Sequence, residues 1–189
     1  MEPAKDFVGA MAPHLAKISP GIQAVPKVGK SIMRINRETR FSKDTTPYKD
    51  WLGLWFWEGD GKSRECPGFY FGLGTAGFVI GAGMHRFGPP YLAKYRAAVG
   101  DSKFGKALAA AVRKVEKKGY EVGGSHYKKV PRGFAADHPH ADLLRHNGLT
   151  AGRNVGLVKD LFGPDAAAYC AGVFKDVSPM HHWLTGVMS

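Results

Sequence analysis

A dense run of basic side chains lies between positions 34 and 49, and its members are Arg34, Arg37, Arg40, Lys43 and Lys49. A guanidinium group is a planar fork that binds phosphate or carboxylate through two parallel hydrogen bonds. Residues three apart do not share one face of a flat strand, so the chain has to turn near Glu38 for the three arginines to converge. Given that turn, the segment predicts a receptor for a phosphate or carboxylate group.

The same segment also has a purely structural interpretation. Glu38 and Asp44 lie within it, and either carboxylate can pair with an arginine and hold a long loop against a sheet. Buried arginines are normally paired, so this alternative stays beside the first.

The net charge supports an anionic partner. The chain carries +11 at pH 7, and segments 27–49 and 103–132 hold nearly all of it. Lys128 and Arg132, near the end of the second segment, are further candidates for ligand contacts. Clustered positive charge attracts small phosphates, nucleic acid and acidic proteins alike. The best hypothesis is therefore a domain that binds an anionic small molecule or nucleic acid.

Two other functions remain open. In an enzyme that acts on an anionic substrate, Asp137 or His138 would be the general acid or base beside the arginines. In an interaction scaffold, Trp51, Trp55 and Trp57 would form a partner surface, although aromatic strands more often belong to a core.

The familiar cofactor and metal motifs fail on context. Residues 72–77 match the letters of a dinucleotide-binding loop, but a strand follows where a helix is required, so a hairpin is the better interpretation. Residues 61–63 and 124–126 lack the glycines of a P-loop and of a nucleophile elbow. The histidine-rich stretches at 138–140 and 181–182 lack the spacing of metal ligands. The sequence thus predicts no cofactor and no metal site.

Length and composition favour one domain in the cytoplasm. A chain of 189 residues suits a single domain with its core at about 7–184, and two cysteines are too few for a disulfide framework. No apolar run approaches the roughly 20 residues that cross a bilayer, and the first residues do not look like a signal peptide.

The hydrophobic pattern predicts an α+β fold. We expect helices at 6–17, 102–118 and 140–146, and two C-terminal helices at 164–174 and 179–188. Ser102 is the expected N-cap of the helix at 102–118. Strands are expected at 31–36, 51–57, 68–71, 77–84, 120–122 and 149–155. The mainly antiparallel sheet then spans residues ~31–84 and ~120–155 and is covered by the helices.

Three motifs carry a family resemblance. Segments 34–49, 67–84 and 127–139 resemble, in order, the bacterial family called domain of unknown function 2461, over about Phe7 to Leu184. The resemblance implies no established activity. Members of that family generally begin with an additional helical segment that contains an Asn-Asn-(Lys/Arg)-x-Trp-Phe type motif, and this chain starts after it. Either the start was assigned too far downstream or this member has lost the segment, and the resemblance implies that its loss would expose apolar surface.

Overall fold

The computed structural model describes residues 2–37 and 46–188, and it shows one six-stranded antiparallel sheet with the order β1-β2-β3-β4-β6-β5. The strands are β1 (Ile22–Gln23), β2 (Leu52–Glu58), β3 (Gly68–Gly74), β4 (Gly77–Met84), β5 (Glu121–Ser125) and β6 (His146–Val155). The helices are α1 (Glu2–Ile18), α2 (Pro89–Gly100), α3 (Ser102–Glu116), α4 (Ala141–Leu144) and α5 (Ala166–Met188), with short 3-10 turns η1 (Ser63–Glu65) and η2 (Lys159–Phe162). The predicted α+β fold is confirmed.

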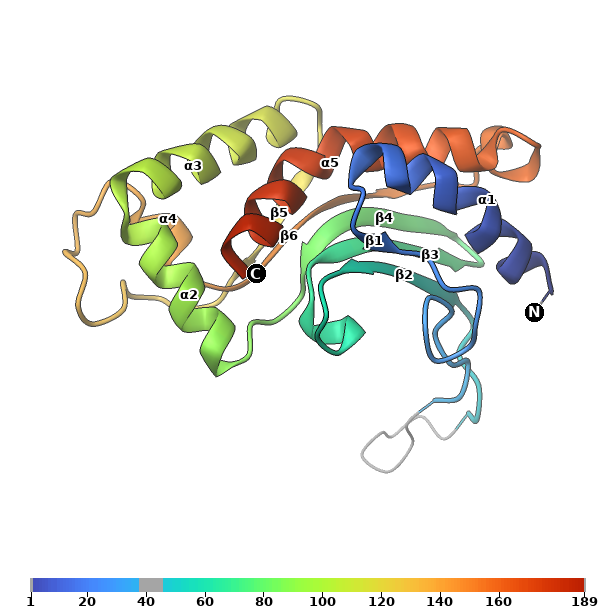
Figure 1. The fold of residues 1–189 in the computed structure, drawn as a ribbon, viewed down its shortest axis with the longest axis horizontal. Helices are drawn as coiled ribbons and strands as arrows, with labels where there is room; N and C mark the ends of the chain where they lie inside the picture. The colour runs from blue at the N-terminus through green and yellow to red at the C-terminus, as the bar shows by residue number, and fades with distance from the viewer. Residues whose placement is uncertain (1, 38–45, 189) are drawn as a thin grey trace.

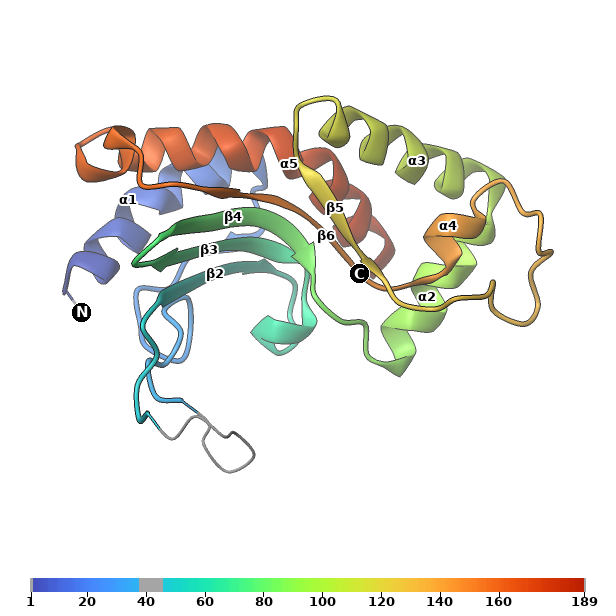
Figure 2. The same cartoon turned by 180° about the vertical axis from the view of Figure 1, so that it is seen from behind.

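Helices α1 and α5 lie along one face of the sheet (Figures 1 and 2). Alternate residues of the strands point at them, because successive side chains on a strand face opposite ways. Phe56, Phe69 and Ile80 from the sheet are fully buried with Phe174 of α5 and Met11 of α1. This face of the sheet is the hydrophobic core.

The other face of the sheet carries no α-helix among the described residues. The strands arch, and their concave side looks away from α1 and α5 (Figures 1 and 2). We call this side the open face; its residues include Trp55, Tyr70, Val79, Gly81, Thr150 and Gly152, which the strand register brings to the same side. The next subsection concerns this surface.

The strand predicted at 31–36 is wrong. Ile32 makes only isolated bridges, with Val28 and Leu54, while Met33 N donates to Gly53 O at 2.9 Å. β1 pairs with the other end of β2, at Trp57 and Glu58. The edge of β2 is therefore shared by β1 and the segment around Ile32, so residues 31–36 cannot pair along its whole length.

The two helices predicted at the C-terminus form one continuous helix, α5, with Pro179 inside it. A proline lacks the N–H that would donate to the carbonyl four residues earlier, here that of Lys175. The hydroxyl of Ser178 donates to Lys175 O instead, at 2.9 Å. This bond satisfies the carbonyl and lets the helix continue past the proline.

Two smaller differences concern α2 and α3. The sequence pattern left α2 unassigned, although Pro89 and Pro90 stand in its first turn, where proline is favoured. α3 begins where predicted, but its N-cap is Asp101, whose side chain accepts hydrogen bonds from the backbone N–H groups of Lys103 and Phe104.

Candidate anion-binding site on the open face

One cross-strand row of the open face has two aromatic residues followed by two glycines. Trp55 of β2 pairs with Tyr70 of β3, and Tyr70 pairs with Gly81 of β4. Gly152 of β6 continues the same row opposite Gly81. One half of the face is therefore covered by large rings, while the other half is bare backbone.

The glycines under the rings allow them to lie close to the sheet. A Cβ atom at Gly68 would lie 2.8 Å from Cζ2 of Trp55, and one at Gly72 would collide with the hydroxyl of Tyr70. A Cβ at Gly53 would collide with the ring of Trp51. Each ring thus rests over a glycine, so the inner side of the ring is covered by backbone.

A cavity of about 910 Å³ lies over this face. Its lining includes Trp51, Trp55 and Tyr70 at the aromatic half, and Gly81 and Gly152 at the bare half. Polar residues also line it, namely Lys49, Arg64, His85, Arg86, Glu121, Thr150, Arg153 and Asn154. The volume lies within the roughly 300–1,000 Å³ typical of small-molecule sites.

A second cavity, of about 300 Å³, adjoins the first and is strongly basic. Its described lining residues are Gly29, Lys30, Met33, Arg34, Trp55, Ser63 and Arg64, and these include three cations and no carboxylate. No ion pair joins Lys30, Arg34 or Arg64 to a carboxylate within residues 2–37 and 46–188. We call Lys30, Arg34 and Arg64 the anion cradle.

Trp55 stands between the two cavities and lines both. Its indole Nε1 donates to the carbonyl of Ser63 at 2.7 Å, which fixes the ring against the η1 turn. The backbone conformation of η1 in turn positions Arg64. The orientation of the aromatic ring and the position of one cradle cation therefore depend on each other.

Lys49 connects the basic loop to the aromatic half of the open face. Its ammonium group lies 4.7 Å from the ring centroid of Trp51 and donates to Arg34 O at 3.2 Å. A cation over an aromatic face is favourable, by about 0.5–1 kcal/mol at exposed sites. The hydrogen bond to the backbone of Arg34 thus places Lys49 beside the anion cradle.

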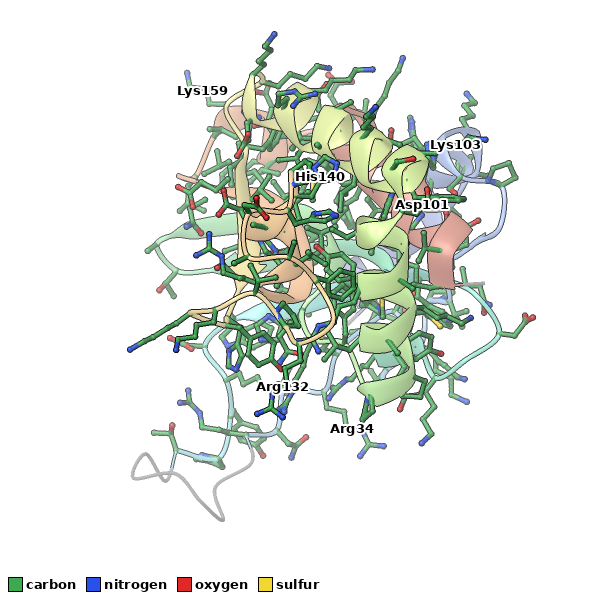
Figure 3. All side chains as sticks on the ribbon, turned by 90° about the vertical axis from the view of Figure 1, so that its left-hand side faces the viewer. Arg34, Asp101, Lys103, Arg132, His140 and Lys159 are labelled. Carbon is green, nitrogen blue, oxygen red and sulfur yellow. The ribbon has the colours of Figure 1, made fainter. Side chains whose placement is uncertain are left out.

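The structure places the other predicted ligand residues differently. Arg37 lies 3.7 Å from the carboxylate of Asp50, whereas Glu38 and Asp44, the two carboxylates of the structural interpretation, lie outside the described residues. Arg40 and Lys43 lie outside the described residues. Lys128 and Arg132 line neither cavity; Figure 3 shows Arg132 below α3, and Figure 1 shows its loop at the left end of the molecule, away from the loop that carries Arg34.

Asp137 and His138 also line neither cavity. His138 Nδ1 accepts a hydrogen bond from the backbone N–H of His140 at 3.0 Å, and its ring packs edge-on against Phe134. His140 lies against α3, where a Cβ at Gly105 would meet its ring. These contacts describe a loop packed on the helices.

The three tryptophans predicted as a partner surface are split. Trp57 is only 4% exposed, whereas Trp51 and Trp55 are half-buried and line the large cavity. The partner surface thus loses one of the three rings on which it was based.

A buried polar cluster lies at the opposite face of the sheet. His181 of α5 is fully buried and its Nε2 lies 2.8 Å from Oε2 of Glu58, which also accepts a hydrogen bond from the Ser19 hydroxyl. Burial raises the pKa of Glu58, but the hydrogen bonds from Ser19 and His181 outweigh it and hold the pKa below its ordinary value. Burial also lowers the pKa of His181, against the pull of Glu58. A catalytic triad needs a hydrogen bond between the serine and the histidine, but here both bond to the carboxylate of Glu58. The cluster therefore joins α5, β2 and the end of α1 and does not have the arrangement of a catalytic triad.

No group of three or more His, Cys, Asp or Glu side chains that could hold a metal ion occurs in the described part of the chain. No helix there is long and apolar enough to cross a membrane.

The comparison with protein families decides the relationship of this chain. A family model described as "Conserved hypothetical protein (DUF2461)" matches residues 1–183. The chain belongs to the DUF2461 family. No curated protein and no solved structure matches it. The open face and the anion cradle of this DUF2461 domain are therefore interpreted from their own chemistry.

Sequence reasoning missed two cradle residues of this DUF2461 domain. Lys30 and Arg64 are separated by 33 intervening residues, yet they line the same cavity, together with Trp55 of β2. The only signal was the charge of each residue. The Trp55 to Ser63 hydrogen bond that completes the site has no sequence signature.

Proposed function

We propose that this DUF2461 domain binds an anionic ligand, with a phosphate group held by Lys30, Arg34 and Arg64. The single observation that carries the proposal is that the anion cradle gathers three cations around a cavity, with no carboxylate among the lining residues that the structure describes. Guanidinium groups bind phosphate through charge-assisted hydrogen bonds, which are stronger than neutral ones. The overall charge of +11 adds long-range attraction for the same kind of ligand.

The three side chains come from two separate segments. Lys30 and Arg34 belong to the loop between β1 and β2, while Arg64 belongs to η1, and all three are exposed. Like charges held together repel one another, so an anion between them relieves a cost that the free protein already bears. This favours a polyvalent anion over a single carboxylate.

We also propose the cytoplasm as the location. Both cysteines, Cys66 and Cys170, are free and buried, which suits a reducing compartment.

The experiment is a titration with inorganic tripolyphosphate, followed by the tryptophan fluorescence that Trp55 contributes. The wild type is expected to bind saturably. Arg34→Gln and Arg64→Gln should each weaken binding about 10-fold, since a hydrogen bond to a charged group is worth roughly 1.5–3 kcal/mol. The control is Lys159→Gln, which removes an exposed cation on the side of the molecule opposite Arg34 (Figure 3).

Added salt should weaken binding in the wild type more than in either arginine variant. Each ion pair between a cradle cation and a phosphate releases counterions on binding, and each variant forms one ion pair fewer. The proposal is abandoned if tripolyphosphate does not bind. It is equally abandoned if Arg34→Gln, Arg64→Gln and Lys159→Gln all bind like the wild type.

A further inference from the structure

The two cavities form one continuous surface. Met33, Trp55 and Arg64 line both of them. A ligand with an anionic group in the anion cradle therefore has its next atoms over the open face. That part of the ligand lies beside Trp55, which lines both cavities, and shares the larger cavity with Tyr70.

The rings are presented by their faces. Because Gly68 and Gly72 lie beneath Trp55 and Tyr70, the inner side of each ring is covered and the outer side looks into the larger cavity. Flat aromatic faces are the surfaces on which nucleobases stack, and such stacking tolerates any base because every base has a π-face. A purely anionic ligand makes no such stacking contact.

The bare half of the open face provides room and hydrogen-bonding groups. Gly81 and Gly152 leave the backbone without side chains over the cavity, and beside them stand Thr150 and the exposed Asn154. A hydroxyl and an amide can donate and accept hydrogen bonds at the edges of bases or at a ribose. Space and polar groups thus lie next to the stacking rings.

We infer that the ligand is a single-stranded nucleic acid, whose bases stack on Trp55 and Tyr70 while a backbone phosphate occupies the anion cradle. This inference rests on the proposed anion binding. It commits to a strand and not to a free nucleotide, because the cations extend along the open face. Lys49 and Arg34 lie near Trp51, and Arg86 follows the end of β4, so a chain of phosphates meets positive charge along its path.

The test is fluorescence anisotropy with a labelled oligouridylate of about ten nucleotides, within the roughly 4–16 nucleotides that single-strand binding folds cover. Unlabelled competitors are the matching duplex, uridine monophosphate, and inorganic polyphosphate of equal charge. Tyr70→Ala should weaken binding of the oligonucleotide about 10-fold, and Tyr70→Phe should restore it, because phenylalanine keeps the ring. Phe162→Ala is the matched control, since Phe162 is an exposed aromatic residue that lines neither cavity.

The outcomes separate the two proposals. Loss of oligonucleotide affinity in Tyr70→Ala, with polyphosphate affinity unchanged in the same variant, supports base stacking. Polyphosphate or the duplex competing as well as the single strand overturns the inference, yet leaves anion binding in place. Uridine monophosphate competing as well as the oligonucleotide overturns the commitment to a strand. If neither polyphosphate nor the oligonucleotide binds, both proposals fail together.

Discussion

The indole of Trp55 donates a hydrogen bond to the carbonyl of Ser63 at 2.7 Å, and Ser63 is itself part of the wall of the smaller cavity. This bond ties the second strand of the sheet to the short turn that carries Arg64. The bond is part-buried, and the ring of Trp55 belongs to a residue that lines both cavities. A ligand that enters the anion cradle should therefore be sensed directly by the ring of Trp55.

A methyl group at Gly81 should destabilise the protein by at least about 2 kcal/mol, because its Cβ would collide with the carbonyl of Ala151 on the neighbouring strand. The three nearest atoms all belong to the backbone of β6, so no flexible side chain can move away. Urea unfolding of Gly81→Ala measures the loss. Gly156→Ala is the control, since nothing lies within 4 Å of its Cβ position, and it should be as stable as the wild type or slightly more so. Equal stability of the two variants would contradict the described register.

Asp101, and not Ser102, should be the residue whose loss weakens α3. The side chain of Asp101 accepts from the N–H groups of Lys103 and Phe104, and these bonds hold its pKa below the ordinary value. Asp101→Ala should lower the melting temperature by about 2–5 °C, as is usual for the loss of a helix cap. Ser102→Ala should leave it nearly unchanged. Thermal unfolding by circular dichroism distinguishes the two, and the reverse order of effects would assign the cap to Ser102.

Stability should fall as the pH drops below about 6.5, the ordinary pKa of histidine. Burial lowers the pKa of His181 in the folded protein, so the unfolded chain binds more protons just below that pH, and protonation favours unfolding. The pKa of Glu58 is also lowered, which adds a further loss below about 4.5. Burial of His146 acts in the same direction as that of His181.

The measurement is the free energy of unfolding in urea between about pH 5 and 8, for the wild type and His181→Phe. One proton contributes at most about 1.4 kcal/mol per pH unit, so the slope in the variant should be smaller by up to that amount. The remaining slope is expected from His146. If the free energy of unfolding of His181→Phe depends on pH as steeply as that of the wild type, His181 does not contribute to the pH dependence.

Much of the fold could be predicted from local patterns. The apolar face of α3 and the glycines between Phe71 and Phe78 each specify one element with no help from the rest of the chain. Residues 72–77 form the β3–β4 hairpin and not a nucleotide loop, as predicted, because a strand continues on both sides. Local hydrophobic period and turn chemistry suffice for such elements.

The errors arise where a contact between segments, or a local side-chain bond, decides the structure. Segment 31–36 has a strand-like composition, but β1 already occupies part of the edge of β2. Pro179 interrupts no helix, because Ser178 satisfies the carbonyl that the proline leaves free. Arg64 joins the anion cradle through a tryptophan bond between separate segments. None of these relationships can be read from residue type and spacing.

The most direct test of anion binding uses the indole N–H signals of Trp51, Trp55, Trp57 and Trp183 in a nitrogen–proton correlation spectrum, assigned by single Trp→Phe variants. Tripolyphosphate should shift the signal of Trp55 saturably, because its N–H donates to the carbonyl of Ser63, which lines the same cavity as the anion cradle. The signal of Trp183, which donates to Phe104 O on the helical side, should stay in place. An unmoved Trp55 signal, or equal shifts at Trp55 and Trp183, would contradict binding at the anion cradle.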